Sequence, residues 1–248
     1  MKRGCVIVTG ASKGIGSAIA SALALEGFTV GCLSRSGGRP SFNSRGTEKN
    51  ASLITAGCDV TDHASIKRAF KAIVEQSKLP LVGLVNNAGL HMEGKSDVLP
   101  IEEFEKVMNA NASSVLMASQ AAFPYFEATG GGTIVNIGSF FDKIGVKRNV
   151  AYCASKAAVG AITRCLAVEW ASQGIRVHNV APGYIATDLN RDSMFSGPLS
   201  EFLAKRIPTG HPGAADDVAE LVKMLFTLKG RFITGETLYI DGGQGMAL

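Results

Sequence analysis

The stretch CVIVTGASKGIGSAIASALALEG, residues 5–27, decides the fold class. Its first part, CVIVTG, is a short run rich in β-branched residues, which is typical of a buried strand. A glycine-rich turn follows, and IGSAIASALALEG then has the composition of a helix that ends at Gly27. A strand that leads through such a turn into a helix is the expected first unit of an α/β fold.

The alternation of short apolar runs and longer helical patterns continues along the chain. Such runs, separated by helices, predict a parallel sheet that helices cover on both faces. Right-handed crossovers then give a doubly wound, Rossmann-type α/β domain of about seven parallel strands. The further expected strands are FTVGCLS, SLITAGCDV, LVGLVNNAG, GTIVNIGS, IRVHNVAPG and ETLYID. The further expected helices cover residues 62–77, 101–129, 149–172 and 214–228.

Two long segments interrupt this alternation, and we expect both to be irregular. One is RSGGRPSFNSRGTEKN, residues 35–50, and the other runs from Gly183 to about Gly210. Long loops in a compact domain are usually functional lids or disordered excursions. We interpret residues 184–210 as a substrate lid. The chain has no linker, repeat or low-complexity tract, so one domain is expected.

The composition is that of a globular protein, with 46% hydrophobic and 19% charged residues. The net charge is only +4 and the basic residues are scattered, which argues against a nucleic-acid partner. Five cysteines without a C-x-x-C pair indicate free thiols in a reducing compartment, and the four histidines lack metal-ligand spacing. No apolar run is long enough for a signal peptide or a membrane span. We expect a cytoplasmic protein with no metal, nucleic-acid or membrane partner.

Three glycines in TGASKGIG indicate a site for a bulky anion. Gly10, Gly14 and Gly16 permit a tight turn and close approach of the backbone, and the helix beyond them offers free N–H groups and a partial positive charge. The spacing is G-x-x-x-G-x-G, which differs from the better-known dinucleotide motif G-x-G-x-x-G. GASKG also fits the G-x-S-x-G turn of serine hydrolases, so Ser12 as a nucleophile is an alternative.

The end of the second expected strand bears on the choice of cofactor. A site for NAD usually has Asp or Glu there, to bond the ribose 2′-hydroxyl. This chain instead has CLSRS, with Arg35 nineteen positions after Gly16 and no acid nearby. A guanidinium can hold a 2′-phosphate through two hydrogen bonds, and Lys13 adds a second positive charge. The two cations therefore favour NADP(H).

The stretch AYCASKAAVGAI places Tyr152 and Lys156 one helical turn apart on the same face. A phenol normally titrates near ~10, which is too high for proton exchange at neutral pH. A neighbouring ammonium favours the phenolate and lowers the pKa. The pair therefore indicates either an acid/base group or an ordinary amphipathic helix.

Several motifs occur in order at matching strand ends: TGASKGIG, NNAG, NIGS, YCASK, APGYIATD and the terminal YIDGG. Together they resemble the short-chain dehydrogenase/reductase family from end to end. The resemblance implies a single dinucleotide-binding and catalytic domain over residues 1–248, which interconverts a carbonyl and a secondary alcohol by hydride transfer. A non-enzymatic dinucleotide-binding regulator is an alternative, although its expected mark, a lost Tyr or Lys, is missing.

The resemblance implies four catalytic residues. Tyr152 would be the general acid/base, and Lys156 would depress its pKa and hold the nicotinamide ribose. Ser139 would bond and orient the carbonyl oxygen, and Asn111 would support a water relay to the lysine. Asp59 and Val60 would flank the adenine. The full implied cofactor set is Gly10, Ser12, Lys13, Gly14, Ile15, Gly16, Ser34, Arg35, Asp59, Val60, Asn87, Ala88, Gly89, Tyr152, Lys156, Pro182, Gly183, Ile185 and Thr187.

The substrate is less well defined by the sequence. Much of the chain is similar to 3-oxoacyl-acyl-carrier-protein reductases, whose acidic partner requires cations near the active site. Glu127 and Gln173 stand where basic residues would help, which argues against a carrier protein. APGYIATDLN also resembles sugar-acid and polyol dehydrogenases, while Phe140, Phe141 and the Met194–Phe195 pair suggest a partly apolar pocket. The resemblance further implies a homotetramer.

Overall fold

The computed structural model describes residues 3–41, 52–188 and 190–246. Its centre is a seven-stranded sheet in the order β3-β2-β1-β4-β5-β6-β9, and every neighbouring pair is parallel. The chain moves outward from β1 in one direction and then returns to continue from β4 in the other. Ligands of such sheets bind beyond the carboxyl ends of the strands at this reversal. The strands are β1 (Cys5–Thr9), β2 (Thr29–Ser34), β3 (Leu53–Gly57), β4 (Leu81–Asn86), β5 (Gly132–Ile137), β6 (Ile175–Pro182) and β9 (Thr237–Ile240).

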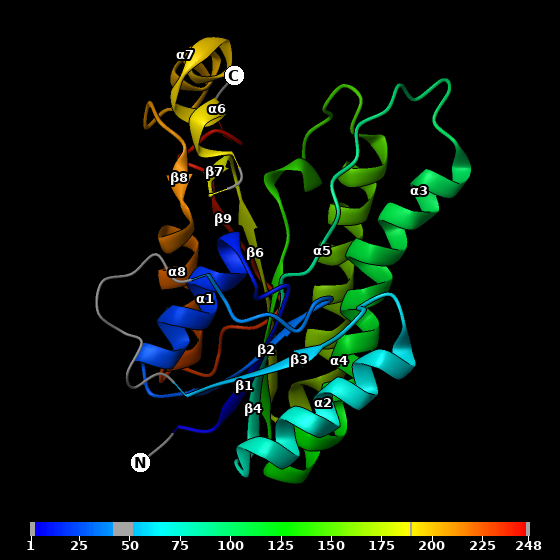
Figure 1. Ribbon diagram of the computed structural model, residues 1–248, viewed down its shortest axis with the longest axis vertical. Coiled ribbons are helices and arrows are strands. Elements are labelled where there is room, and N and C mark those ends of the chain that lie inside the picture. The colour runs from blue at the N-terminus through cyan, green and yellow to red at the C-terminus, as the bar shows by residue number, and fades with distance from the viewer. Residues whose placement is uncertain (1–2, 42–51, 189, 247–248) are drawn as a thin grey trace.

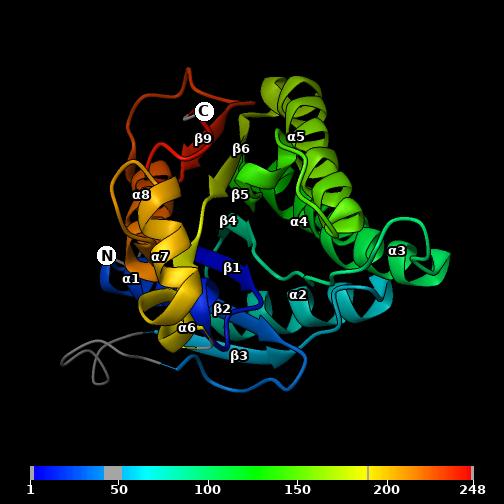
Figure 2. The same cartoon turned by 90° about the horizontal axis from the view of Figure 1, so that it is seen from above.

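Helices cover both faces of the sheet, as the sequence predicts (Figures 1 and 2). Helices α1 and α8 lie together on one face, and α2, α4 and α5 lie on the other. Each face buries its own apolar core, and both cores contain side chains of β1 and β4. The doubly wound α/β prediction is therefore confirmed. The helices are α1 (Gly14–Leu25), α2 (His63–Ser77), α3 (Ile101–Met108), α4 (Ser114–Thr129), α5 (Val150–Trp170) and α8 (Ala215–Thr227).

The expected helical run over residues 101–129 is helical throughout, but it is not α-helical throughout. A π-helical segment, Asn109–Ser113, lies between α3 and α4. Such segments are rare and occur frequently at functional sites, because the extra residue turns side chains out of helical register. The segment carries Asn111.

The segment 184–210 is also different from the expected irregular loop. It contains a two-residue strand β7 (Ile185–Ala186) and two short helices, α6 (Arg191–Phe195) and α7 (Gly197–Arg206). Strand β7 pairs with β8 (Gly213–Ala214). Three buried apolar side chains, Met194, Leu203 and Ile207, hold this segment together, so helix formation buries an apolar face that a loop would expose.

Part of the other expected irregular segment, residues 42–50, lies outside the described residues. None of the described helices combines the length and apolar character needed to cross a membrane.

Candidate active site

The glycine-rich turn joins β1 to α1 at the reversal of strand order. Gly10 and Gly14 have φ angles of +64° and +58°, which L side chains rarely adopt. A Cβ atom at Gly16 would lie 2.3 Å from the carbonyl oxygen of Gly10. Each glycine is thus required by the backbone, and the turn leaves the N-terminus of α1 open to an anion.

The turn is tied to the end of β4 by a set of hydrogen bonds. The Asn87 side-chain amide donates to the carbonyl oxygens of Thr9 and Gly10 at 3.0 and 3.1 Å. The Thr9 hydroxyl oxygen accepts from the backbone N–H groups of Asn87 and Ala88 at 3.0 and 3.1 Å. These bonds fix the turn against the end of β4, and they give Thr9 and Asn87 a structural role.

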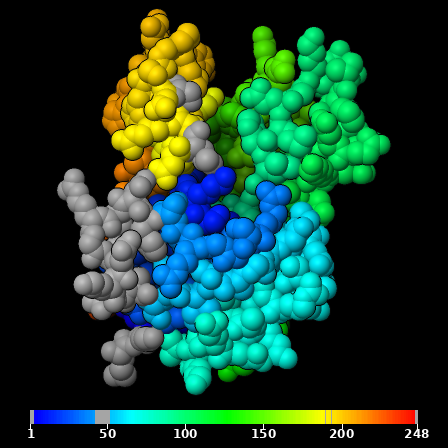
Figure 3. Space-filling view, viewed as in Figure 1, coloured from blue at the N-terminus to red at the C-terminus, as the bar shows by residue number. Residues whose placement is uncertain are grey.

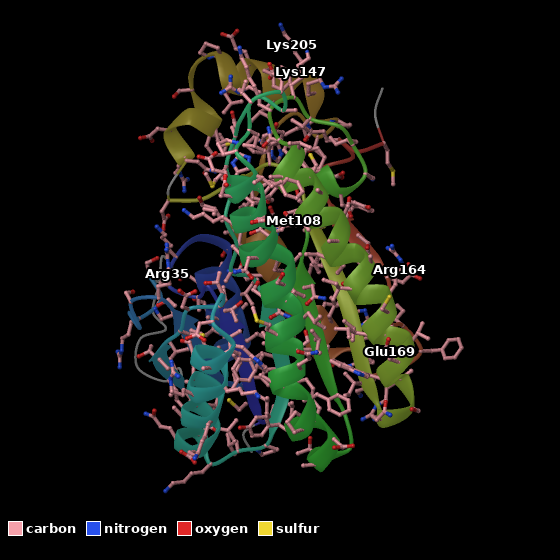
Figure 4. All side chains as sticks on the ribbon, turned by 90° about the vertical axis from the view of Figure 1, so that its right-hand side faces the viewer. Arg35, Met108, Lys147, Arg164, Glu169 and Lys205 are labelled. Atoms are coloured by element: carbon pink, nitrogen blue, oxygen red, sulfur yellow. The ribbon has the colours of Figure 1, made fainter. Side chains whose placement is uncertain are left out.

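A cavity of about 570 Å³ opens beside this turn. The cation of Lys13 and the guanidinium of Arg35, both exposed, are part of its lining. Hydrogen bonds from Thr61 lower the pKa of the Asp59 carboxyl, and the nearby charge of Arg35 lowers it further. Figure 4 shows Arg35 beside the blue strands, far from Lys205 of α7. The predicted residues in this lining are Gly10, Ser12, Lys13, Ser34, Arg35, Asp59, Val60, Asn87, Ala88 and Gly89.

A second cavity, of about 430 Å³, lies between the ends of β5 and β6 and the segment 184–210. It shares Asn87, Gly89 and Leu90 with the first cavity, so the two form one groove across the carboxyl edge of the sheet. Figure 3 shows the recess between the yellow segment, which carries α6 and α7, and the green segment opposite. The predicted residues in its lining are Ile15, Asn87, Gly89, Ser139, Tyr152, Lys156, Pro182, Gly183, Ile185 and Thr187.

Lys156 is the lysine of this second cavity. Its side chain is only 5% exposed, and its Nζ donates a hydrogen bond to the carbonyl oxygen of Ile137 at 2.8 Å. Burial lowers the pKa of Lys156 to about 8 because the charged form loses hydration. Helix α5 supplies both Lys156 and Tyr152, and the ammonium lies 5.5 Å from the centre of the Tyr152 ring.

Tyr152 and Ser139 face the same cavity from different elements. Burial raises the pKa of Tyr152, and a hydrogen bond with Ser139 opposes this increase. The expectation that the pKa of Tyr152 is depressed is therefore wrong for the chain by itself. Desolvation of the phenolate outweighs the favourable interactions, so the phenol holds its proton at neutral pH.

Asn111 lies in the π-helical segment and is 1% exposed. Its side-chain oxygen accepts from the Leu90 N–H at 2.6 Å, and its amide nitrogen donates to the Leu90 carbonyl and the Ser155 hydroxyl. A Cβ atom at Gly89 would lie 3.1 Å from the Asn111 oxygen and 3.9 Å from Lys156 Nζ. Asn111 thus fixes the chain beside the lysine, and does not bond its own helix backbone.

Among the cavity residues that the sequence interpretation did not name are two with rings beside the proposed acid/base group or its aromatic neighbours, His91 and Tyr184. The His91 ring meets the Tyr152 ring edge-on, with 4.8 Å between centroids. Its Nε2 lies 2.6 Å from the Asn149 side-chain oxygen, which can only accept, so Nε2 is the donor. The position of His91 in the sequence, two residues after the NNAG motif at a strand end, is the feature that could have identified it as a site residue. Phe195, by contrast, is exposed and does not line the cavity.

The arrangement does not support the hydrolase alternative. Ser12 lies in the first cavity, which contains no histidine. His178 is fully buried within β6, and His211 lies in a separate cavity with Thr209. The described part of the chain also contains no group of three or more His, Cys, Asp or Glu side chains that could hold a metal ion.

A cavity of about 850 Å³, larger than either part of the groove, lies elsewhere. Its lining includes Gly132 and Ile175, which begin β5 and β6, so it is at the opposite edge of the sheet from the groove. Ligands of doubly wound sheets bind at the carboxyl edge. Size alone therefore does not identify the active site.

Comparison with known proteins agrees with this geometry. The family model described as enoyl-(acyl carrier protein) reductase matches residues 10–244. That range covers nearly the whole chain, including the glycine turn and the Tyr152–Lys156 pair. The chain belongs to the short-chain dehydrogenase/reductase family, whose members bind a nicotinamide dinucleotide.

Individual relatives cover the full domain. D-threitol dehydrogenase of Mycolicibacterium smegmatis is 34% identical, over 96% of this chain and 91% of the relative. The 3-oxoacyl-(acyl-carrier-protein) reductase MabA of Mycobacterium tuberculosis is 35% identical, over 97% of this chain and 92% of the relative. The structure of a gluconate 5-dehydrogenase from Burkholderia cenocepacia in complex with NADP and tartrate has a TM-score of 0.87 and 28% identity, covering 100% of this chain and 97% of the other. The chain is thus an oxidoreductase of alcohol and carbonyl groups.

Proposed function

We propose that the protein is an NADP(H)-dependent oxidoreductase that interconverts a carbonyl and a secondary alcohol with Tyr152 as the general acid/base. The observation that carries the proposal is the continuous groove: cations lie in its first cavity, and Tyr152, Ser139 and Lys156 lie in its second. A dinucleotide needs such an extended site, with the phosphates near a helix N-terminus.

The residues of the groove fit a bound dinucleotide. The glycine turn offers close backbone approach, because side chains are excluded at Gly10 and Gly16 by conformation and by space. The first helical turn of α1 contains no acidic side chain that would repel phosphate. When bound, the cofactor would supply or accept the hydride.

The chain's own residues would manage the proton and the carbonyl oxygen. Tyr152 would donate its phenolic proton to the oxygen during reduction and take it back during oxidation. Ser139 would hydrogen-bond the same oxygen and stabilise the charge that develops on it. The ammonium of Lys156, which is hydrogen-bonded to the Ile137 carbonyl oxygen, would place a positive charge beside the phenol and hold the cofactor ribose. Asn111 fixes the loop near Lys156.

The preference for NADP(H) rests on Arg35 and Lys13. Both cations lie in the first cavity, and Asp59 in the same lining already interacts with Arg35 and Thr61. A 2′-phosphate adds negative charge at this end, which the two cations would stabilise. By analogy, the Burkholderia gluconate 5-dehydrogenase is described in complex with NADP.

The reaction would be 3-oxoacyl reductase-like, in line with the similarity to MabA. A sugar-acid or polyol dehydrogenase is the second candidate, because D-threitol and gluconate 5-dehydrogenases are also similar. The sequence interpretation disfavours an acyl carrier protein because of Glu127 and Gln173, but these residues lie beside the starts of β5 and β6, at the opposite edge of the sheet from the groove, and carry no argument about docking at the groove. A homotetramer in the cytoplasm completes the proposal, with light scattering as the test of assembly.

The test is initial-rate kinetics with NADPH and NADH over a panel of carbonyl compounds. Tyr152→Phe removes the proton but keeps the ring, so turnover should be abolished while NADPH binding, followed by fluorescence, stays nearly intact. Retained turnover in this variant would overturn the acid/base role, and a clear NADH preference of the wild type would refute the cofactor assignment.

A further inference from the structure

The wall of the substrate cavity is built from aromatic rings. Phe140 and Phe141 follow Ser139 directly, and their ring centroids are 4.8 Å apart. Tyr184 meets both rings edge-on, at 5.7 and 6.3 Å. Phe141 also meets the ring of Tyr152 at 5.9 Å and 85°. The rings therefore continue up to the proposed proton donor.

The lid adds an apolar thioether to this wall. Met194 of α6 lines the cavity, and its side chain is packed with Leu203, Ile207 and Tyr184. Thioethers adapt to ring surfaces and make favourable contacts with their edges. A flat apolar group beside the reacting carbon of a substrate would thus contact the rings of the Phe140–Phe141 turn and the sulfur of Met194 in α6.

Two polar side chains of the same cavity, Asn190 and His91, already have hydrogen-bond partners within the protein. The Asn190 amide bonds to Thr187 and to the Ile185 carbonyl, and Nε2 of His91 bonds to Asn149. Burying a hydroxyl without a partner costs about 1–3 kcal/mol. Each unmatched hydroxyl of a sugar would therefore weaken binding.

A carboxylate substrate also lacks an evident partner. Among the described lining residues there is no arginine and one lysine, Lys156, whose ammonium is bonded to Ile137 and whose pKa is lowered to about 8 by burial. Arg206 of α7 is near enough to lower the pKa of Tyr184, but burial and the charge of Glu93 raise it, and neither charged residue lines the cavity. A sugar acid would have to leave its charge unpaired in an apolar site.

We infer that the substrate is a ketone, or the matching secondary alcohol, that carries an aromatic ring beside the reacting carbon, and not a polyol or sugar acid. The ring would lie against Phe141, Tyr184 and Met194 while the oxygen meets Tyr152 and Ser139. The inference rests on the proposed function and narrows its substrate class.

The experiment compares kcat/KM of the wild type for acetophenone, erythrulose and 5-ketogluconate with saturating NADPH. Acetophenone should be preferred by about 100-fold or more over both polyhydroxy ketones. If either polyhydroxy ketone is preferred, the proposed function stands and the substrate class is overturned. If none of the three is reduced, the substrate class is overturned; the proposed function is refuted as well only if a 3-oxoacyl thioester is also not reduced with NADPH or NADH.

A pair of variants on the same short helix tests the contact itself. Met194→Gln keeps the length of the side chain but adds a polar amide, so kcat/KM for acetophenone should fall by about 10-fold, mainly through KM. Phe195→Gln, at a 53% exposed neighbour outside the lining, is the matched control and should leave kcat/KM within about twofold. Equal effects of the two substitutions, or no effect of the first, would contradict the inferred contact.

Discussion

The ammonium group of Lys156 donates a hydrogen bond to the carbonyl oxygen of Ile137, the last residue of β5, at 2.8 Å. This bond joins the helix that carries Tyr152 to the strand that precedes Ser139. It holds a cation in a nearly water-free position, although burial disfavours the charge. The buried ammonium therefore serves the site but lowers the stability of the folded protein, and this loss of stability can be measured.

Lys156→Met should abolish turnover without lowering the stability of the protein at pH 7. Methionine fills a similar volume and removes the buried charge, so its thermal midpoint should equal or exceed that of the wild type. Burial lowers the pKa of Lys156 from 10.5 to about 8, so the unfolded chain binds more protons than the folded chain between these values. The wild type should therefore gain stability relative to the variant as pH rises through this window. Calorimetry from pH 7 to 10.5 measures the difference, and a midpoint several degrees lower for the variant at pH 7 would contradict the prediction.

Ser139→Ala should move the pH profile of alcohol oxidation to higher pH. Oxidation needs the phenolate of Tyr152, and the hydrogen bond from Ser139 opposes the increase in pKa that burial causes. Without that bond the pKa rises further, so a higher pH is needed to form the base. Carbonyl reduction at pH 7 should also fall by about 100-fold, because the oxygen loses a hydrogen-bond donor.

The control for this prediction is Ser139→Thr, which keeps the hydroxyl. It should restore part of the reduction rate and return the pH profile toward that of the wild type. An unchanged profile in Ser139→Ala would show that Ser139 does not interact with the phenol during turnover.

The sequence predicts the strands and turns that carry the site better than the contacts between its side chains. Local patterns suffice for the strand ends, because β-branched runs and glycine turns reflect short-range backbone preferences. They cannot show the π-helical turn at Asn109–Ser113, because the residues on both sides have ordinary helical patterns. They also cannot show that His91 meets Tyr152, since that contact depends on the packing of distant segments.

The pKa of Tyr152 illustrates the same limit. The spacing of Tyr152 and Lys156 is visible in the sequence and predicts a depressed pKa from charge alone. The desolvation that raises the pKa of Tyr152 depends on how the segment 184–210 and the Phe140–Phe141 turn enclose the cavity. The helices α6 and α7 of that segment were likewise not predicted, because its sequence is rich in Gly, Pro and Ser.

Arg35→Ala should reduce kcat/KM for NADPH by about 10–100-fold and leave kcat/KM for NADH within about twofold, because only NADPH carries the 2′-phosphate that the guanidinium would hold. Lys67→Ala removes an exposed cation of α2 outside the groove and is the matched control. Parallel losses with both cofactors would show that Arg35 supports the fold of the first cavity and does not recognise the phosphate.

Gly16→Ala should prevent cofactor binding and lower stability by about 1–3 kcal/mol, because the new methyl group would lie 2.3 Å from the Gly10 carbonyl oxygen and 2.4 Å from the Asn87 amide. Relief of this clash requires the glycine turn and the β4 end to separate, which breaks the hydrogen bonds that shape the first cavity. Gly145→Ala, where nothing lies within 4 Å, is the control and should change neither property. The measurements are urea denaturation and fluorescence titration with NADPH. Normal NADPH affinity in Gly16→Ala would show that the turn can shift without loss of the cofactor site, against the close-packed geometry seen here.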